Sequence, residues 1–320
     1  MKDLDSGITL QCYMDKFVYI KPTQIDEHKN EDYHIYLICS MPKSYFVENS
    51  IKFTSSNLTC ELIQNNKTIK IEHSYLEIFD GTPISGTSFH LNKDKSILTL
   101  SYYKSFVKQK DIIISANEIY GASGLMKSKK EKLLYIGQSF GKKTSRTSAE
   151  RLSNHATLQK ILADNQSFGG DDEIQLYLMN FKMNHILHLS GMDKQTNMDS
   201  TANKFFDTMN DYNQRMCIDL VEACLINYFK PQYNTQYKNK ILNVKSSKFK
   251  IFYDNGITRI SVQILPDTYS DKVLKQKNIR MPQIILYTDS ASYDTADYHN
   301  LIVSDLDKNL YSTYAQLKNI

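Results

Sequence analysis

The stretch Met216-Cys-Ile-Asp-Leu-Val-Glu-Ala-Cys-Leu-Ile-Asn-Tyr-Phe229 predicts a helix that is apolar on almost every side. Such a helix is expected to be buried, and Pro231 ends it. Glu222 shares a stripe of this helix with Ile218 and Ile226. Because burying a lone charge is costly, the Glu222 carboxylate must be paired, hydrogen-bonded or bound to a metal ion.

A second polar group lies upstream, around a short predicted strand, Leu133-Leu-Tyr-Ile-Gly137. The capping box Thr147-x-x-Glu150 predicts the start of a helix that runs to about Ala163. Arg151 and His155 are four residues apart and therefore share a face of that helix. On spacing alone, a solvated polar face explains them more simply. The strand end, the basic loop and the first helical turn nevertheless offer a tyrosine, a guanidinium and backbone donors, which suit a phosphodiester.

Together these segments resemble the GIY-YIG endonuclease superfamily. The matching parts are Tyr135-Ile-Gly-Gln-Ser139, Arg151 with His155, and Glu222-Ala-Cys-Leu-Ile-Asn-Tyr-Phe-Lys-Pro-Gln-Tyr-Asn234. The last segment is the most specific, because its Glu, Leu-Ile, Lys-Pro and Tyr-Asn stand at the same offsets as in the excision-repair incision nuclease of bacteria. The resemblance covers about residues 118–236.

The resemblance implies a three-stranded antiparallel sheet flanked by helices, which hydrolyses phosphodiester bonds of DNA with one divalent cation. Glu222 would hold Mg²⁺ or Mn²⁺, and Arg151 would bind the scissile phosphate and stabilise its transition state. Tyr135 would activate the attacking water. His155 would assist the proton movement or orient the first motif tyrosine, and Asn234 would brace the site.

The first motif triplet, Gly-Ile-Tyr in the family, should stand on a strand about ten residues before the second. The best candidate is Glu118-Ile-Tyr120, which makes Tyr120 the first tyrosine. The loop that contains Phe140–Arg146 is longer than is usual in the family. It either adds contacts to DNA or displaces Arg151 from the site. The predicted DNA-binding residues are Lys129, Lys130, Lys142, Lys143 and Arg146.

The charge pattern agrees with a DNA partner only locally. The net charge of +4 is too small to name a partner, but Lys127–Arg151 carries eight basic residues against two acidic ones. Strand-like runs fill residues 1–117, and a hairpin is predicted from Phe249–Tyr253 and Ile257–Ile264. We therefore expect an α+β chain with a β-rich domain at 1–117, the nuclease module at 118–236 and a β-containing region at 237–320.

The composition restricts the remaining possibilities. Five cysteines without a C-x-x-C pair predict reduced, mostly buried thiols. No apolar run approaches the ~20 residues of a membrane helix, and Met1–Gly7 lacks an apolar leader, so a cytoplasmic protein without a membrane partner is expected. There are two alternatives to an active nuclease. One is a catalytically inactive nucleic-acid-binding or scaffold protein, and the other is a regulatory assembly protein in which the β-rich flanking regions do the binding. The sequence predicts neither the oligomeric state nor the DNA specificity.

Overall fold

A computed structural model describes the chain over most of its length. The described residues are 7–53, 57–74, 85–104, 107–109, 111–122, 129–140, 147–167, 172–188, 203, 206, 212–238, 250–255, 257–266, 284–287, 292–294, 301–305 and 310–314. The chain divides into two compact units. Unit 1 consists of residues 1–40, 130–164 and 174–320, and unit 2 of residues 41–129 and 165–173. This division differs from the expected boundaries after residues 117 and 236, because the β-rich segment is inserted within unit 1 instead of preceding it.

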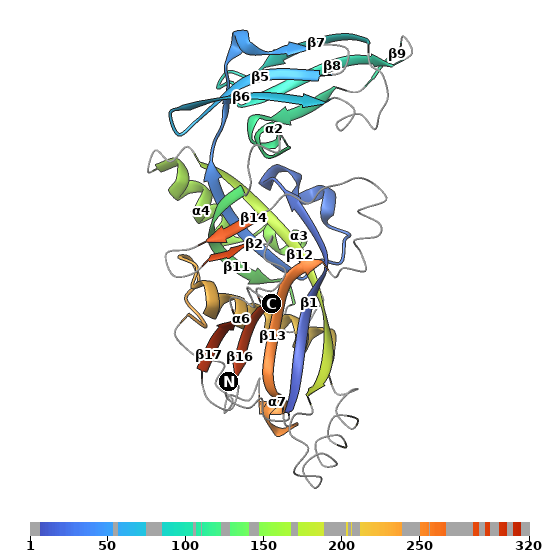
Figure 1. The fold of residues 1–320 in the computed structure, drawn as a ribbon, viewed down its shortest axis with the longest axis vertical. Coiled ribbons are helices and arrows are strands. Elements are labelled where there is room, and N and C mark those ends of the chain that lie inside the picture. Colours follow the sequence, from blue (N-terminus) through green and yellow to red (C-terminus); the bar gives the residue numbers. More distant parts are fainter. Residues whose placement is uncertain are drawn as a thin grey trace, which may run out of the picture. The chain divides into compact units, whose positions relative to one another are not determined.

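A large mixed sheet forms the centre of unit 1. Its strands are β1 (Gly7–Ile20), β2 (Ile35–Pro42), β11 (Lys129–Gln138), β12 (Asp172–His188), β13 (Ile257–Pro266), β14 (Ile284–Tyr287), β15 (Ser292–Asp294), β16 (Leu301–Asp305) and β17 (Leu310–Tyr314). Among the described residues nine strands follow the order β15-β14-β11-β2-β12-β1-β13-β16-β17. Figure 1 shows β12, β1 and β13 side by side, and β1 pairs antiparallel with β12 but parallel with β13. The mixed α+β class is confirmed, and the sheet is larger than the three strands expected.

Helices pack on both faces of this sheet. Residues that alternate along a strand point to opposite faces, so β2, buried along nearly its whole length, supplies both hydrophobic layers. Ile35 and Leu37 pack in the layer of α6 (Gln214–Phe229). Tyr36 and Ile38 pack in the layer of α3 (Ser148–Leu152) and α4 (Ala156–Ser167), which also includes Ile25 of the 3₁₀ helix η1 (Pro22–His28).

The predicted buried helix is α6, and local signals set both of its ends. The Asn213 side chain accepts a hydrogen bond from the backbone N–H of Met216 at 3.0 Å, as an N-cap does. Lys230 adopts a left-handed conformation with φ 50°, and its N–H donates to the Ile226 carbonyl at 2.8 Å. Pro231 follows directly, as predicted.

Unit 2 consists of two small sheets around a separate core. Its elements are β3 (Tyr45–Phe46), η2 (Glu48–Ser50), β4 (Lys52–Phe53), β5 (Asn57–Gln64), β6 (Lys67–Ser74), β7 (Ser85–Leu91), β8 (Ile97–Lys104), β9 (Val107–Lys108), β10 (Ile112–Ser115) and α2 (Ala116–Ala122). β5 and β6 form a hairpin through Asn65 and Asn66, which both have positive φ, as a two-residue hairpin turn requires. Leu62 from one sheet, Leu100 from the other and Ile119 from α2 belong to one buried cluster. The β-rich character expected for this part is correct.

The C-terminal hairpin is not formed. Residues 250–254 form helix α7 (Lys250–Asp254) instead of a strand. β13 pairs instead with β1 and β16, and its Ile260 and Val262 are buried in the α6 layer. Pairing beside the long strand β1 places these apolar side chains in a core, which favours it over an exposed two-stranded hairpin.

Two simpler expectations can be compared directly with the structure. The five cysteines are all buried and none forms a disulfide, as predicted. Within the part of the chain that the structure describes, no helix is long and apolar enough to cross a membrane.

Candidate active site

Two tyrosines from strands far apart in sequence lie side by side. β2 and β11 pair antiparallel with Tyr36 opposite Gly137 and Ile38 opposite Tyr135, so the two tyrosine side chains lie on one face. Their ring centroids are 6.1 Å apart. Tyr36 is fully buried, whereas Tyr135 is half-buried. Tyr135 is therefore the one of the pair that a substrate can approach.

The structure places Tyr36, and not Tyr120, on the strand that pairs with the strand of Tyr135. Tyr120 lies on helix α2 and packs against the core of unit 2. The sequence signal that we missed is a capping box: the Ser115 N–H donates to the Glu118 carboxylate at 2.6 Å, and the Glu118 N–H donates to the Ser115 hydroxyl at 3.2 Å. The strand that pairs with Tyr135-Ile-Gly137 instead begins with Ile35-Tyr36, which is also an Ile-Tyr pair.

Gly137 makes the close approach of the two strands' tyrosines possible. A Cβ atom at Gly137 would lie 2.5 Å from the Cζ and Oη atoms of Tyr36 and 2.8 Å from Cε1 of Tyr135. The Tyr36 ring therefore lies directly on the backbone of the second motif triplet, where no other residue fits.

We expect Gly137→Ala to displace the Tyr36 ring. Tyr36 is fully buried and cannot move outward, so overpacking should cost about 1–3 kcal/mol of unfolding free energy. Thermal or urea unfolding measures this cost. The control is Ala163→Ser, at an exposed position of α4, which should leave stability nearly unchanged. An unchanged stability of Gly137→Ala would contradict the close packing.

His155 lies at the junction of two helices, where a single helix was expected. α3 ends at Leu152, Ser153 and Asn154 form a turn, and α4 begins at Ala156. Ser and Asn bond readily to nearby backbone and favour such breaks, and the Ser153 hydroxyl donates to the Glu150 carbonyl at 2.9 Å.

The contacts of His155 define which ring nitrogen carries its proton. Its Nδ1 accepts the N–H of Leu158 at 3.3 Å, and its Nε2 lies 3.1 Å from the Tyr36 hydroxyl. Burial, followed by the charge of Arg151, lowers the pKa of His155 below 6.5, so the ring is neutral at pH 7. A neutral ring that accepts at Nδ1 carries its proton on Nε2 and donates to Tyr36. His155 therefore holds the Tyr36 hydroxyl through this hydrogen bond.

We expect His155→Asn to separate this contact from the helix cap. Asn can accept the Leu158 N–H as an N-cap but cannot reach the Tyr36 hydroxyl. Its unfolding temperature should stay near that of the wild type, whereas His155→Ala should lose about 1 kcal/mol of stability. If the site is catalytic, both variants should lose activity. In the wild type the neutral His155 is lost as pH falls through its lowered pKa, so activity should fall there. The His155 contribution to stability should decrease earlier, from about pH 6.5 down to that lowered pKa, because the unfolded chain binds the proton first. An acid limb unchanged in His155→Asn would exclude His155 as its source.

Arg151 lies on α3, next to the same two tyrosines. The capping box that begins this helix is present: the Glu150 N–H donates to Thr147 Oγ1 at 3.3 Å, and the Thr147 N–H donates to the Glu150 carboxylate at 2.9 Å. Arg151 is half-buried, and its positive charge lowers the pKa values of both Tyr36 and Tyr135. Arg151 therefore lies close to both tyrosines, although the loop before α3 is long.

Glu222 is half-buried on α6, between residues that are otherwise mostly buried. Its negative charge raises the pKa values of Tyr36 and Tyr135, so the carboxylate belongs to the same electrostatic cluster. One turn earlier on the helix, Asp219 accepts a hydrogen bond from the Gln138 side chain at 2.7 Å. This bond ties α6 to β11 beside the second motif triplet.

The net pKa shifts of the two tyrosines are upward. Burial is the largest cause for each, and it raises the pKa of the deeply buried Tyr36 far above 10. The pKa of Tyr135 is raised by burial and Glu222, and lowered by Arg151 and by a hydrogen bond from Tyr36. The charge of Arg151 therefore does not by itself lower the pKa of Tyr135 below its usual value.

Asn234 braces the second motif strand. It is buried, its Oδ1 accepts the N–H of Ile136 at 2.9 Å, and its Nδ2 donates to the carbonyl of Ile136 at 2.7 Å. The side-chain amide thus satisfies the backbone between Tyr135 and Gly137 as a neighbouring strand would.

The predicted DNA-binding residues are only partly described. Lys129 and Lys130 begin β11. Lys142, Lys143 and Arg146 lie outside the described residues.

The described residues offer a sparse set of metal donors. Among them there is no group of three or more His, Cys, Asp or Glu side chains that would hold a metal ion. Glu222 is a single hard oxygen donor beside the tyrosines. Mg²⁺ keeps several waters and commonly takes only one or two carboxylates plus substrate phosphates, so a hydrated Mg²⁺ fits this donor, whereas a structural zinc site does not.

Comparison with known proteins assigns no relative. No protein-family model matches the chain, and neither curated proteins nor solved structures match it significantly.

Proposed function

We propose that the chain is a metal-dependent endonuclease of the GIY-YIG type, which hydrolyses phosphodiester bonds of DNA. One observation carries the proposal: a cluster of five polar side chains drawn from β2, β11, α3, the α3–α4 junction and α6. Its members, which we call the tyrosine cluster, are Tyr36, Tyr135, Arg151, His155 and Glu222.

The chemistry of phosphodiester hydrolysis calls for these residue types. The substrate is already anionic and repels a nucleophile, so the site needs fixed positive charge at the phosphate and a base near the attacking water. In the tyrosine cluster, Arg151 supplies the positive charge. Tyr135, half-buried and therefore accessible, is the group that takes the proton from water.

A chain of hydrogen bonds supports Tyr135 in this role. His155 donates from Nε2 to the Tyr36 hydroxyl, which leaves the Tyr36 proton directed to Tyr135. A hydrogen bond donated to the Tyr135 oxygen favours its phenolate form. Tyr36 and His155 thus orient the base and stabilise its deprotonated state, while Asn234 holds the strand.

Glu222 would hold the cation. Bound there, Mg²⁺ or Mn²⁺ supplies positive charge that offsets the carboxylate, stabilises the leaving oxygen and lowers the pKa of nearby groups. Without a cation, Glu222 opposes deprotonation of Tyr135. Deprotonation of Tyr135 should therefore depend on a cation bound at Glu222.

The experiment is cleavage of supercoiled plasmid DNA by the purified chain with Mg²⁺, with Mn²⁺ and with excess EDTA. Nicking or linearisation that requires the cation is expected. Arg151→Ala should lower kcat by orders of magnitude while binding DNA with little change, because its interaction is made mainly in the transition state. DNA binding by the wild type without cleavage under any of these conditions would favour the inactive binding protein instead.

A further inference from the structure

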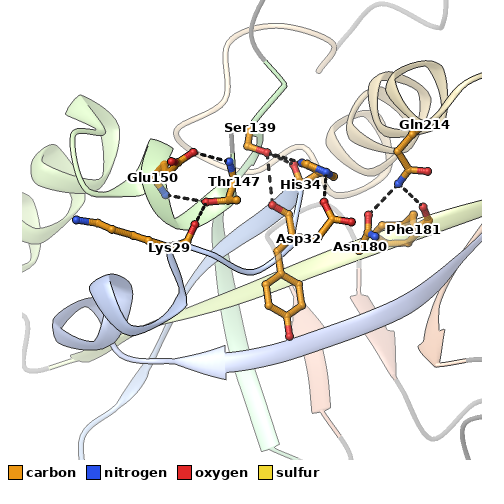
Figure 2. A network of polar contacts seen from close by, with 10 residues as sticks. Lys29, Asp32, His34, Ser139, Thr147, Glu150, Asn180, Phe181 and Gln214 are labelled. Carbon is orange, nitrogen blue, oxygen red and sulfur yellow. Dashed lines mark hydrogen bonds and ion pairs between the residues drawn. The ribbon is translucent and has the colours of Figure 1, made fainter. Parts of the chain in front are cut away.

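The turn that precedes β2 contacts several elements of the tyrosine cluster at once. This turn, residues 29–34, is called the entry turn below. Figure 2 shows its polar contacts with Ser139, at the end of β11, and with Thr147, the N-cap of α3. β2 itself carries Tyr36, two residues after the entry turn.

His34 links the entry turn to the end of β11. The ring is nearly fully buried, its Nε2 lies 2.6 Å from the Asp32 carboxylate, and its Nδ1 lies 3.1 Å from the Ser139 hydroxyl. Because a carboxylate only accepts, Nε2 carries a proton and donates it to Asp32, while Nδ1 shares a hydrogen bond with the Ser139 hydroxyl. The Ser139 N–H also donates to the His34 carbonyl at 2.9 Å, and the His34 ring packs on Phe140 with centroids 4.1 Å apart.

The same turn holds the start of α3. The Thr147 hydroxyl donates to the Lys29 carbonyl at 2.8 Å, and the Ser148 N–H donates to the Tyr33 carbonyl at 2.7 Å. Both ends of the segment between Ser139 and Thr147 are therefore fixed to one six-residue turn. This explains how Arg151 stays in the cluster despite the length of that segment.

Asp32, His34 and Ser139 resemble a Ser-His-Asp arrangement, but they do not make a second hydrolytic site. Ser139 is 0% exposed, and its hydroxyl faces the ring and the backbone carbonyls of Tyr33 and His34. A nucleophile must reach its substrate, so the arrangement is a structural link.

We propose that His34, through Ser139, is a positioning residue for the reaction, a proposal that rests on the proposed function. The β2–β11 ladder ends with the pairs Gly137–Tyr36 and Gln138–Ile35, and the His34–Ser139 link fastens the strands just beyond them. Loss of the link lets this end of the ladder fray, which shifts the Tyr36 ring away from Tyr135. A misplacement of about 1 Å can cost on the order of 10²-fold in rate.

Two substitutions of His34 separate its two links. In His34→Asn the amide replaces Nδ1 and keeps the contact with Ser139, whereas in His34→Gln it replaces Nε2 and keeps only the contact with Asp32. We expect His34→Asn to stay within about threefold of the wild-type kcat, and His34→Gln and Ser139→Ala to lose about 10–100-fold, with KM for DNA unchanged in all three. Asp32→Asn is the matched control. It changes only the exposed partner of His34, leaves the His34–Ser139 contact in place and should keep kcat.

A second readout does not need activity. Hydrogen exchange at the amides of Gly137 and Ser139 should accelerate in His34→Gln and Ser139→Ala but not in His34→Asn. If the wild type cleaves DNA, and His34→Asn and His34→Gln have the same kcat, the positioning role is overturned. If the wild type does not cleave DNA, the proposed function fails, and unchanged exchange in all variants would then refute the link itself.

Discussion

Glu222→Gln is expected to abolish Mg²⁺-dependent DNA cleavage, with a loss of about 10³-fold or more in kcat, and to leave the fold intact. The amide keeps the volume of the side chain but removes the charge that would hold the cation. A loss of that size corresponds to about 4 kcal/mol of transition-state stabilisation. Circular dichroism and thermal unfolding test the fold, and calorimetric titration with Mg²⁺ tests the binding of the ion.

Glu150→Gln is the matched control for this substitution. Glu150 is exposed, stands next to Arg151 and serves the α3 capping box, a role that Gln also fills. The control removes one carboxylate near the cluster and should change the rate by no more than a few-fold. A well-folded Glu222→Gln protein that still cleaves with Mg²⁺ would show that the ion binds elsewhere.

Local signals explain which parts of this arrangement were predictable. The apolar run of α6, Pro231 after it and the capping box at Thr147 act over one or two helical turns, and the structure has each of them where predicted. The strand that carries Tyr135 was also predictable, because Leu133–Ile136 is apolar and ends at a glycine. These features predict the helices and the second motif strand without any knowledge of the rest of the chain.

The remaining features depend on contacts between distant residues. Ile8 of β1 pairs with Ile257 of β13, a contact that no local pattern encodes. Tyr36 pairs with Gly137 across an inserted unit that begins at residue 41 and ends at residue 129. An expected separation of about ten residues therefore led to Tyr120, although the Ile-Tyr pair was present at Tyr36.

The tyrosine cluster also shows why the residue types alone did not determine the electrostatics. Arg151 lowers the pKa values of both tyrosines, as expected from its charge, yet burial and Glu222 outweigh it. The sequence identifies the charges but not the depth at which each hydroxyl is buried. Tyr36 is buried and Tyr135 is partly exposed, and the different roles proposed for them depend on this difference.

Three Tyr→Phe substitutions should therefore differ widely in effect. Tyr135→Phe removes the hydroxyl that we propose to take the proton from water and should lower kcat by about 10²–10⁴-fold. Tyr36→Phe removes only the hydrogen bonds that orient this hydroxyl, and we expect a loss of about tenfold, close to the 1.4 kcal/mol scale of one hydrogen bond. Tyr120→Phe is the control, because Tyr120 belongs to the core of unit 2, and it should leave kcat unchanged.

The pH dependence of cleavage gives the decisive comparison between Tyr135 and the other two tyrosines. In the metal-free chain burial, followed by the charge of Glu222, raises the pKa of Tyr135, and a cation held by Glu222 would offset the second cause. Below the pKa that Tyr135 has with the cation bound, the phenolate fraction increases about tenfold for each pH unit. The wild-type rate at saturating Mg²⁺ should therefore rise with pH from pH 7 until that pKa is reached, and the rate of Tyr36→Phe should rise in parallel at a lower level. Tyr135→Phe should lose this rise. A Tyr135→Phe protein that keeps the full pH dependence would assign the base to another group, and a larger loss in Tyr36→Phe than in Tyr135→Phe would reverse the roles of the two tyrosines.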